Sequence, residues 1–459
     1  MERPNAWKSY DEKQLAQLED LCAEYREFLD KGKTERECAQ LTVAMAEAAG
    51  YRNLKEVVKN GETLKTGDKV YAVCMGKSVV LFHIGKRDIE DGMNILGAHI
   101  DSPRLDIKQN PLYEDSDFAY LDTHYYGGVK NYQWVAMPLA VHGVVAKKDG
   151  TTVSVVVGED DNDPVVGITD LLPHLAAKQM AKKASLVIEG ENLDVLIGSK
   201  PLAGAEKDAV KAGTLQILKE KYGMEEEDFL SAELEIVPAG RARDAGLDRS
   251  MIMAYGQDDR VCAFTSLKAM LSVEEVEKTA CCILVDKEEI GSVGATGMES
   301  KFFENMTAEL LDRMGQYSEL KLRRVLANSK MLSSDVNAAY DPLFANAFEK
   351  KNASFAGRGM VFSKFTGARG KSGSNDANAE YIAEIRKVMD EEKIHYQLAE
   401  LGKVDVGGGG TIAYILALYG MEVIDCGVAV LNMHAPWEVT SKADVFEAER
   451  GYEAFLRRI

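Results

Sequence analysis

The strongest constraint on the fold is an alternation of apolar runs and helical segments that begins at about residue 245. The apolar runs are rich in Val and Ile, and their length and bounding residues are typical of buried strands. They lie at 281–287, 359–365 and 422–432, and the helical segments lie at 260–271, 377–390, 411–420 and 441–459. This alternation predicts an α/β fold with a mostly parallel mixed sheet that is flanked by helices on both faces.

The first hundred residues predict further parts of the same domain. Residues 10–49 have apolar side chains at helical spacing, and Thr34 with Glu37 forms the pattern of an N-terminal capping box. Strand signals follow within 70–100, where short apolar runs are bounded by Gly and charged residues. We therefore expect this part of the chain to contribute strands to the α/β sheet.

The middle of the chain has a different pattern. An Asp149-Gly150 turn separates two Val-rich runs, which is a strong hairpin signal, and 186–199 has a similar pattern. A polar helical stretch follows at 207–223. We interpret these features as an inserted β-rich domain. The predicted boundaries are 103–244 for the insertion and 1–102 with 245–459 for the discontinuous domain that it interrupts.

Composition excludes several classes of partner. The 459-residue chain has 55 Lys and Arg against 74 Asp and Glu, a net charge of −19, so we expect neither nucleic acid nor a membrane as a partner. No run approaches the roughly 20 apolar residues of a membrane span, and the first residues lack the apolar region of a signal peptide. The seven cysteines form no CxxC pair, which favours a cytoplasmic location over a disulfide framework.

Several predicted strands end in side chains that can bind a metal ion. Because the carboxyl ends of parallel strands meet at one edge of a sheet, we expect these side chains to lie close together. Histidine and carboxylate ligands without cysteine suit one or two divalent ions, zinc first, with manganese or cobalt as substitutes. A single histidine or acid pair is more often structural, so the set matters more than its members. The candidates are His99, Asp101, Asp258, Asp259, Asp286, Glu288, Glu289, Asp335 and His434.

Six motifs, in their order and spacing, resemble those of the aspartyl aminopeptidase family of dinuclear zinc metallopeptidases. They are GAHIDSPRLD (97–106), QDDR (257–260), DKEEIGS (286–292), SSD (333–335), SKFTGARG (363–370) and NMHAPWE (432–438). Together they cover nearly the whole chain, and the set is specific although no single motif is. The resemblance implies a zinc exopeptidase-like catalytic domain that removes N-terminal residues from peptides.

The resemblance also implies roles for the candidate residues. His99 and Asp335 would hold one zinc ion, Glu289 and His434 a second, and Asp258 would bridge the two. The three carboxylates would offset three of the four positive charges, and the remaining charge favours a zinc-bound hydroxide. Glu288 would be the general base, and Asp101 would support His99. A cis peptide bond is implied between Asp258 and Asp259.

Substrate and assembly are implied in the same way. Lys364 occupies a position similar to that of the family's acid-recognising lysine, so Asp and Glu are the expected first residues. Departures from the family pattern, at Asp259 and after Asp335, leave neutral first residues as an alternative. His174, in a PHLA segment, resembles a histidine that contacts peptide substrate in a neighbouring subunit's site. The implied assembly is a homo-oligomer, a dodecamer built from dimers through the inserted domain.

Two other interpretations remain open from the sequence. A related dinuclear zinc carboxypeptidase or deacylase would use similar motifs, and a non-catalytic shell-forming scaffold would keep the fold. The SKFTGARG and PHLA segments favour the aminopeptidase, and the complete ligand set with Glu288 favours an enzyme. The four glycines at 407–410 lack the Lys-Ser/Thr of a phosphate-binding loop. We interpret them as a tight turn with close packing near the active site.

Overall fold

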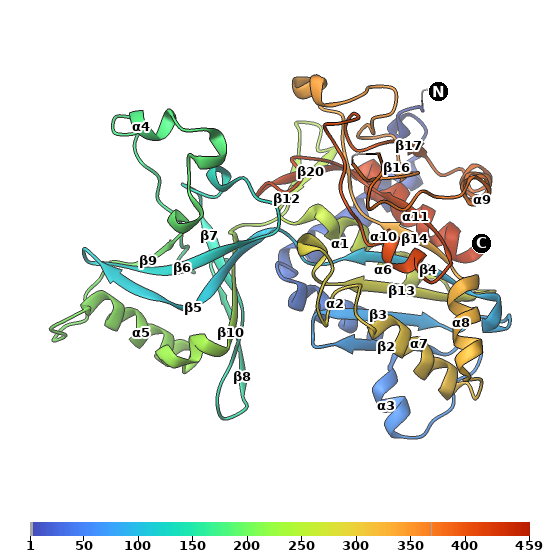
Figure 1. Ribbon diagram of the computed structural model, residues 1–459, viewed down its shortest axis with the longest axis horizontal. Coiled ribbons are helices and arrows are strands. Elements are labelled where there is room, and N and C mark those ends of the chain that lie inside the picture. The colour runs from blue at the N-terminus through green and yellow to red at the C-terminus, as the bar shows by residue number, and fades with distance from the viewer. Residues whose placement is uncertain (1–2, 369) are drawn as a thin grey trace. The chain divides into compact units, whose positions relative to one another are not determined.

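The computed structural model describes residues 3–368 and 370–459, and these form two compact units (Figure 1). The main unit contains the residues up to Asp101, 242–433 and 438–459, and the insertion unit contains 102–241 and 434–437. The sequence predicts the insertion at 103–244, whereas the contacts place it at 102–241 and add a short segment close to the C-terminus. Position 369 of the SKFTGARG motif lies outside the described residues.

The main unit is built on a nine-stranded sheet with the order β1-β2-β3-β13-β4-β14-β18-β16-β17. Its central strands β13, β4, β14 and β18 are parallel, while β3 and β16 run antiparallel to their central neighbours. The predicted mostly parallel mixed sheet is therefore confirmed. The strands are β1 (Arg52–Asn53), β2 (Lys69–Cys74), β3 (Ser78–His83), β4 (Met93–His99), β13 (Thr279–Val285), β14 (Lys330–Ser334), β16 (Met360–Ser363), β17 (Tyr396–Leu398) and β18 (Glu422–Gly427).

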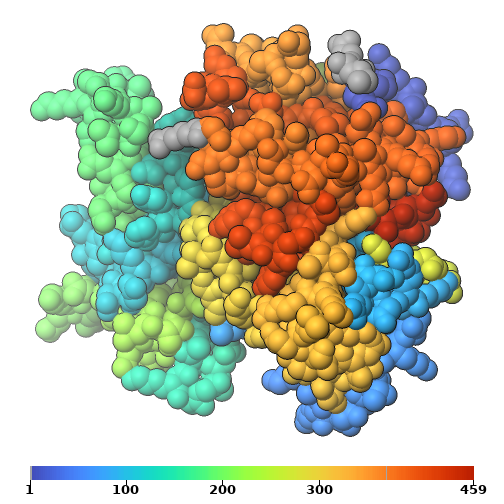
Figure 2. All heavy atoms as spheres, turned by 45° about the vertical axis from the view of Figure 1, so that its right-hand side comes forward, coloured from blue at the N-terminus to red at the C-terminus, as the bar shows by residue number. Residues whose placement is uncertain are grey.

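Helices cover both faces of this sheet, because successive side chains of each strand point to opposite sides. Leu96 belongs to the core beneath α1, α2, α6, α9 and α11, and Ile95 belongs to the core beneath α3, α7, α8 and α10. The two ends of the chain meet in the first of these layers, where α1 (blue) contacts α11 (red; Figures 1 and 2). The helices are α1 (Glu12–Lys31), α2 (Glu35–Ala48), α3 (Leu54–Lys59), α6 (Gln257–Ser272), α7 (Phe302–Arg313), α8 (Glu319–Asn328), α9 (Ala379–Glu391), α10 (Ala413–Ala417) and α11 (Lys442–Arg458). Within the described residues, no helix has both the length and the apolar character required to cross a bilayer.

A second, five-stranded sheet completes the main unit. Its order is β11-β12-β20-β19-β15, and β12 leads directly into α6. Its strands are β11 (Arg243–Ala245), β12 (Met251–Ala254), β15 (Asn337–Ala338), β19 (Ala429–Leu431) and β20 (Glu438–Ser441). This small sheet therefore connects the start of α6 to segments from near the C-terminus.

The insertion unit is a six-stranded antiparallel sheet with the order β8-β7-β10-β5-β6-β9. The predicted Asp149-Gly150 turn joins β7 and β8, and the Asp149 carboxylate accepts a hydrogen bond from the Thr151 amide at 2.8 Å. The elements are β5 (Arg104–Asp115), β6 (Phe118–Tyr126), β7 (Leu139–Ala146), β8 (Thr152–Val157), β9 (Val195–Gly198), β10 (Ala232–Pro238), α4 (Ala177–Met180) and α5 (Ala209–Tyr222). The β-rich prediction for this region is confirmed.

The second predicted hairpin, at 186–199, is wrong. Only β9 forms there, and the residues before it form 3-10 turns at Ala184–Leu186 and Gly190–Asn192. Strand β9 pairs with β6, which is distant in sequence, so it requires no local partner. The alternating pattern correctly predicts the strand β9, but the tertiary fold sets which strand pairs with it.

The predicted capping box at the start of α2 is confirmed. The Thr34 hydroxyl accepts a hydrogen bond from the Glu37 amide at 3.2 Å, and a Glu37 carboxylate oxygen accepts one from the Thr34 amide at 3.0 Å. The same oxygen accepts a hydrogen bond from the Lys33 amide at 2.9 Å. Backbone donors that the helix itself cannot satisfy are thereby paired.

Replacing Thr34 with Ala removes the hydroxyl of this cap. We expect the variant to lose about 1 kcal/mol of stability, because one amide of the first turn loses its acceptor. Urea unfolding followed by circular dichroism measures the change, and Thr34→Ser is the matched control because it keeps the hydroxyl. Equal midpoints for the Ala and Ser variants would show that the cap contributes nothing.

Candidate metal and catalytic site

The parallel strands of the main sheet end at one edge, and candidate residues follow their ends. His99 is the last residue of β4, in register with Val285 at the end of β13. Asp335 comes directly after β14, and its amide donates a hydrogen bond to the carbonyl of Cys426 at 2.8 Å. The convergence expected from the sequence therefore occurs in the main unit.

Asp258 enters the same region from the start of α6 and is buried. The peptide bond between Asp258 and Asp259 is cis, as the family resemblance predicts. The Asp258 amide donates a hydrogen bond to a carboxylate oxygen of Glu438 at 3.0 Å. The side chain of Gln257 donates to the Glu438 carbonyl at 2.7 Å, so β20 holds both residues at the start of α6.

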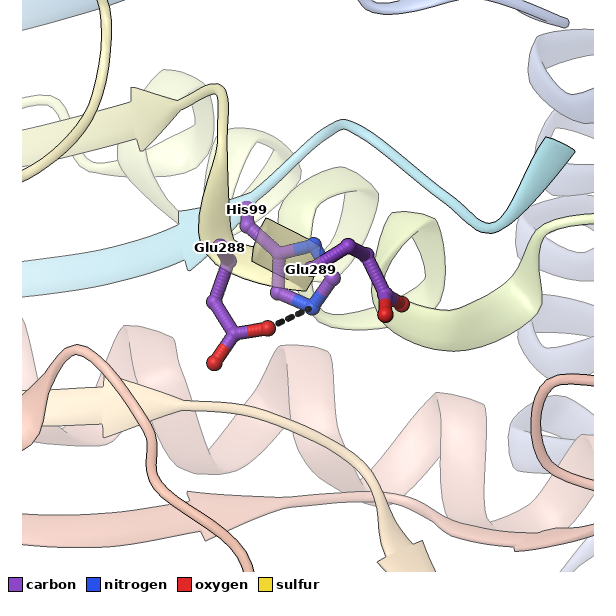
Figure 3. Close-up of side chains that lie close together, drawn as sticks. All are labelled: His99, Glu288 and Glu289. Atoms are coloured by element: carbon purple, nitrogen blue, oxygen red, sulfur yellow. Dashed lines mark ion pairs between the residues drawn. The ribbon is translucent and has the colours of Figure 1, made fainter. Parts of the chain in front are cut away.

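Three carboxylates surround the imidazole of His99. Its Nε2 atom lies 3.3 Å from Asp258 Oδ1, 3.8 Å from Glu288 Oε2 and 4.0 Å from Asp335 Oδ1 (Figure 3 shows the Glu288 pair). Glu289 also belongs to this cluster. One ligand atom from each of His99, Asp258 and Asp335 lies within 4.8 Å of the others, and the same holds for His99, Glu288 and Glu289.

Asp101 lies behind this cluster and is fully buried. Its Oδ1 lies 3.2 Å from Nδ1 of His99, on the side of the ring opposite the other carboxylates. Its two oxygens also accept hydrogen bonds from the amides of Glu288, at 3.2 Å, and Glu289, at 3.1 Å. One carboxylate therefore orients the histidine and anchors the turn that carries both glutamates.

The two glutamates lie in a short 3-10 helix, Glu288–Ile290. Lys287, just before it, has a left-handed backbone with φ 73°, which turns the chain sharply at the end of β13. The side chains of Glu288 and Glu289 nevertheless leave in different directions on either side of the His99 ring (Figure 3). The division of roles between them is therefore geometrically possible.

The electrostatics of the cluster require a compensating positive charge. Burial alone lowers the pKa of His99, but hydrogen bonds to Asp101 and Asp258 and the charge of Glu288 outweigh it and raise the pKa well above its usual value. Burial raises the pKa of Asp335 well above its usual value, and the charges of Glu288 and Asp259 add to this shift. Buried carboxylates this close together are costly as anions unless a cation lies among them.

The donor set fits a divalent transition metal. It contains one imidazole and several carboxylates without a thiolate, which suits zinc and also manganese or cobalt. A divalent ion would replace the proton on His99 and would balance the carboxylates. The cluster therefore supplies both the ligands and the charge that such an ion requires.

Three further predicted residues are His434, His174 and Lys364. His434 belongs to the insertion unit, has a left-handed backbone, and hydrogen-bonds through Nδ1 with the carbonyl of Gly128 at 2.9 Å. His174 lies in an exposed turn of the insertion unit. Lys364 follows β16 with an exposed side chain, and its carbonyl accepts the Ala377 amide at 2.9 Å.

Sequence reasoning missed the role of Glu438. This residue ends the NMHAPWE motif and is 1% exposed, and it holds the Asp258 amide. Its only sequence signal was its place in that motif, because a single acid at the start of a strand has no distinctive pattern. Its partner lies 180 residues away, so the interaction depends entirely on the tertiary fold.

Replacing Asp101 with Asn tests its support of the cluster. The variant keeps one acceptor oxygen but loses the charge opposite Nδ1 of His99, so we expect about 10- to 100-fold weaker zinc binding. Competition with a chromophoric chelator measures the affinity. Asp20→Asn, at an exposed position of α1, is the matched control. Equal zinc affinity in both variants would remove Asp101 from the metal site.

Comparison with known proteins agrees with this geometry. The sequence model of the family described as Aminopeptidase I zinc metalloprotease (M18) matches residues 28–456. A Clostridium acetobutylicum protein named probable M18 family aminopeptidase 1 is 62% identical over 456 residues, which cover 99% of this chain and 98% of its own. The protein of the same name from Thermotoga maritima is 45% identical over 460 residues, with complete coverage of both chains.

Solved structures give the same result. The crystal structure of an M18-family aminopeptidase from Thermotoga maritima has a TM-score of 0.95 at 44% identity, and aminopeptidase I from Clostridium acetobutylicum has 0.93 at 59%, both over 100% of each chain. The yeast mApe1 dodecamer, 21% identical with a TM-score of 0.78 over 95% and 96% of the two chains, shares the fold. The chain belongs to the M18 family of zinc metalloaminopeptidases, the family of the aspartyl aminopeptidases, and it removes N-terminal residues from peptides.

Proposed function

We propose that this aminopeptidase acts on peptides with an acidic first residue, through two zinc ions per chain and Glu288 as the general base. The observation that carries the mechanism is the pair of hydrogen bonds that the amides of Glu288 and Glu289 donate to the Asp101 carboxylate, because they hold Glu288 beside His99. A hydrolysis panel tests the proposal. It measures the hydrolysis of peptides that begin with Asp, Glu, Leu, Lys or Ala. Each peptide is tested with a free α-amine and with an acetylated one, in the presence and absence of a chelator.

In this proposal His99 and Asp335 hold one zinc ion, Glu289 and His434 hold the other, and Asp258 bridges them. The grouping of His99 with Asp258 and Asp335 supports the first part, while the assignment of His434 rests on the family resemblance. Manganese or cobalt would suit the same ligands. When bound, the ions would polarise the scissile carbonyl and activate water for attack.

Glu288 takes a proton from the attacking water and delivers it to the nitrogen of the departing amine. Its carboxylate is mostly buried, and its backbone is fixed through Asp101, so it loses little freedom on binding substrate. A general base of this kind works best with a pKa near the working pH. The free α-amine of the substrate would bind as a cation among the same acids.

Lys364 would recognise the acidic side chain of the first residue, because a carboxylate requires a cationic or hydrogen-bonding partner. The side chain of Lys364 is exposed, which supports the proposal that it can contact a bound peptide. Neutral first residues are the alternative, since the segment after Asp335 departs from the family pattern. The ratio of Asp to Leu turnover in the panel distinguishes these outcomes.

We further propose a dodecamer built from dimers, in which His174 contacts the substrate of a neighbouring subunit. The exposed turn around His174 supports this, because it presents Leu171, Leu172 and Leu175 with 46%, 49% and 67% exposure. The yeast relative that forms a dodecamer has the same fold. Free cysteines, most of them buried, fit the proposed cytoplasmic location.

Replacing Glu288 with Gln removes the base but keeps the size of the side chain. We expect kcat to fall by about 100- to 10,000-fold, because proton transfer is lost while the metal ligands remain. Steady-state kinetics together with metal analysis measures both properties. The exposed Glu380→Gln variant on α9 is the control. Loss of zinc together with activity would instead assign Glu288 as a ligand.

Replacing Lys364 with Ala tests recognition of the first residue. We expect kcat/KM for peptides beginning with Asp or Glu to fall about 10- to 100-fold, with little change for Leu peptides, because only acidic side chains lose a partner. Lys371→Ala, in the same segment and paired with Asp376, is the matched control. An equal loss for Asp and Leu peptides would contradict a role in specificity.

A further inference from the structure

The four consecutive glycines at 407–410 differ in their surroundings. A Cβ atom on Gly407 would lie 2.0 Å from the carbonyl oxygen of Leu401, and one on Gly408 would lie 2.8 Å from the backbone nitrogen of Ala368. Gly408 also has a φ of +132°, which L side chains rarely adopt. Close backbone packing therefore accounts for Gly407 and Gly408, as predicted for the glycine run.

Packing does not account for Gly409 and Gly410. No heavy atom lies within 4 Å of a Cβ placed on either residue, and neither has a φ in the left-handed region. Both are exposed. In the described part of the chain, every other glycine either has a neighbour within 4 Å of its Cβ position or has a positive φ. Since glycine increases the entropy lost on folding, the fold itself would favour alanine at these two positions.

The two glycines are nevertheless held in a defined place. The Gly409 amide donates a hydrogen bond to the carbonyl of Thr366 at 3.1 Å, which ties it to the segment that carries Lys364. On the other side, the Thr411 hydroxyl donates a hydrogen bond to the carboxylate of Asp425, a buried residue of β18. The exposed backbone is thus fixed between the Lys364 segment and the main sheet.

The chain that follows the glycines packs against β4, the strand that ends at His99. A Cβ on Gly97, two residues before His99 on β4 and on the same face of the strand, would lie 3.5 Å from Cδ1 of Ile412. Burial and a hydrogen bond to Glu299 raise the pKa of Tyr414 in α10, and the charge of Glu288 adds to that shift. Residues on the C-terminal side of Gly410 therefore lie within electrostatic reach of the proposed base.

We propose that Gly409 and Gly410 form a side-chain-free wall of the pocket for the first residue of the peptide. The side chain of that residue lies directly against their backbone, and glycine is present because a Cβ would occupy the space that the substrate fills. A Cβ atom on this wall would weaken the binding of peptides with a large first residue more than the binding of peptides with a small one. The inference rests on the aminopeptidase activity and does not depend on a preference for acidic residues.

The test uses full-length, zinc-loaded Gly409→Ala and Gly410→Ala. For each variant, kcat and KM are measured with free-amine peptides that begin with Ala, Leu, Phe or Asp. We expect KM to rise about tenfold for Leu and Phe peptides, and much less for Ala peptides, because one added methyl group discriminates by size. The thermal midpoint should be unchanged or higher, since both positions accept alanine without strain.

Gly408→Ala is the matched control in the same loop, and we expect it to lower the thermal midpoint because its Cβ meets backbone. Unchanged KM for every peptide in both test variants would overturn the proposal. A fall in kcat that is equal for all first residues would also overturn it, and would indicate that the glycines are a hinge. A change in assembly size, measured by light scattering, would assign them to a subunit contact instead. If the wild-type enzyme shows no preference for Asp, the proposed acidic specificity fails, while the comparison of Ala with Leu still decides this inference.

Discussion

The carboxylate of Asp101 is shared between the imidazole of His99 and the backbone amides of Glu288 and Glu289. It is fully buried, and a buried anion is tolerated only where donors surround it. Those donors come from the end of β4 and from the turn after β13, so a single charge fixes two neighbouring strand ends relative to each other. The orientation of the histidine and the place of the proposed base therefore depend on the same interaction.

The rest of the site is assembled by strands that end at one edge. His99 and Asp335 follow neighbouring parallel strands, while Asp258 comes from a helix that begins at the small sheet. Glu438 holds that helix start from β20, which places a C-terminal segment in support of a residue in the middle of the chain. The chain also passes between its two units next to these residues, at Asp101–Ser102 and at Trp437–Glu438. Asp101 and Glu438, which hold other residues of the site, are thus each adjacent in sequence to a segment of the insertion unit.

The glycines at 407–410 show how a sequence motif can contain two kinds of constraint. Two of them are required by the backbone that packs against them, and the other two face open space. A fold tolerates alanine where space and φ permit it, and the proposed contact with the first residue of the peptide gives Gly409 and Gly410 a role that packing does not. Family membership makes the substrate peptide the relevant molecule, and it also favours an aminopeptidase over the carboxypeptidase, deacylase and scaffold interpretations.

Sequence patterns alone were sufficient to predict the mixed α/β sheet, the β-rich insertion, the cap of α2, and the five acids and one histidine that meet in the main unit. These follow from local rules: periodicity of 2 or 3.6 residues, capping chemistry, and the convergence of parallel strand ends. Three features could be learned only from the folded structure: β9 pairs with β6, Glu288 and Glu289 lie in a 3-10 turn, and Glu438 accepts a hydrogen bond from the Asp258 amide. Each of these depends on groups that are far apart in the chain or on one left-handed residue, Lys287. Local sequence propensity does not predict such partners, because the packing of the whole unit determines them.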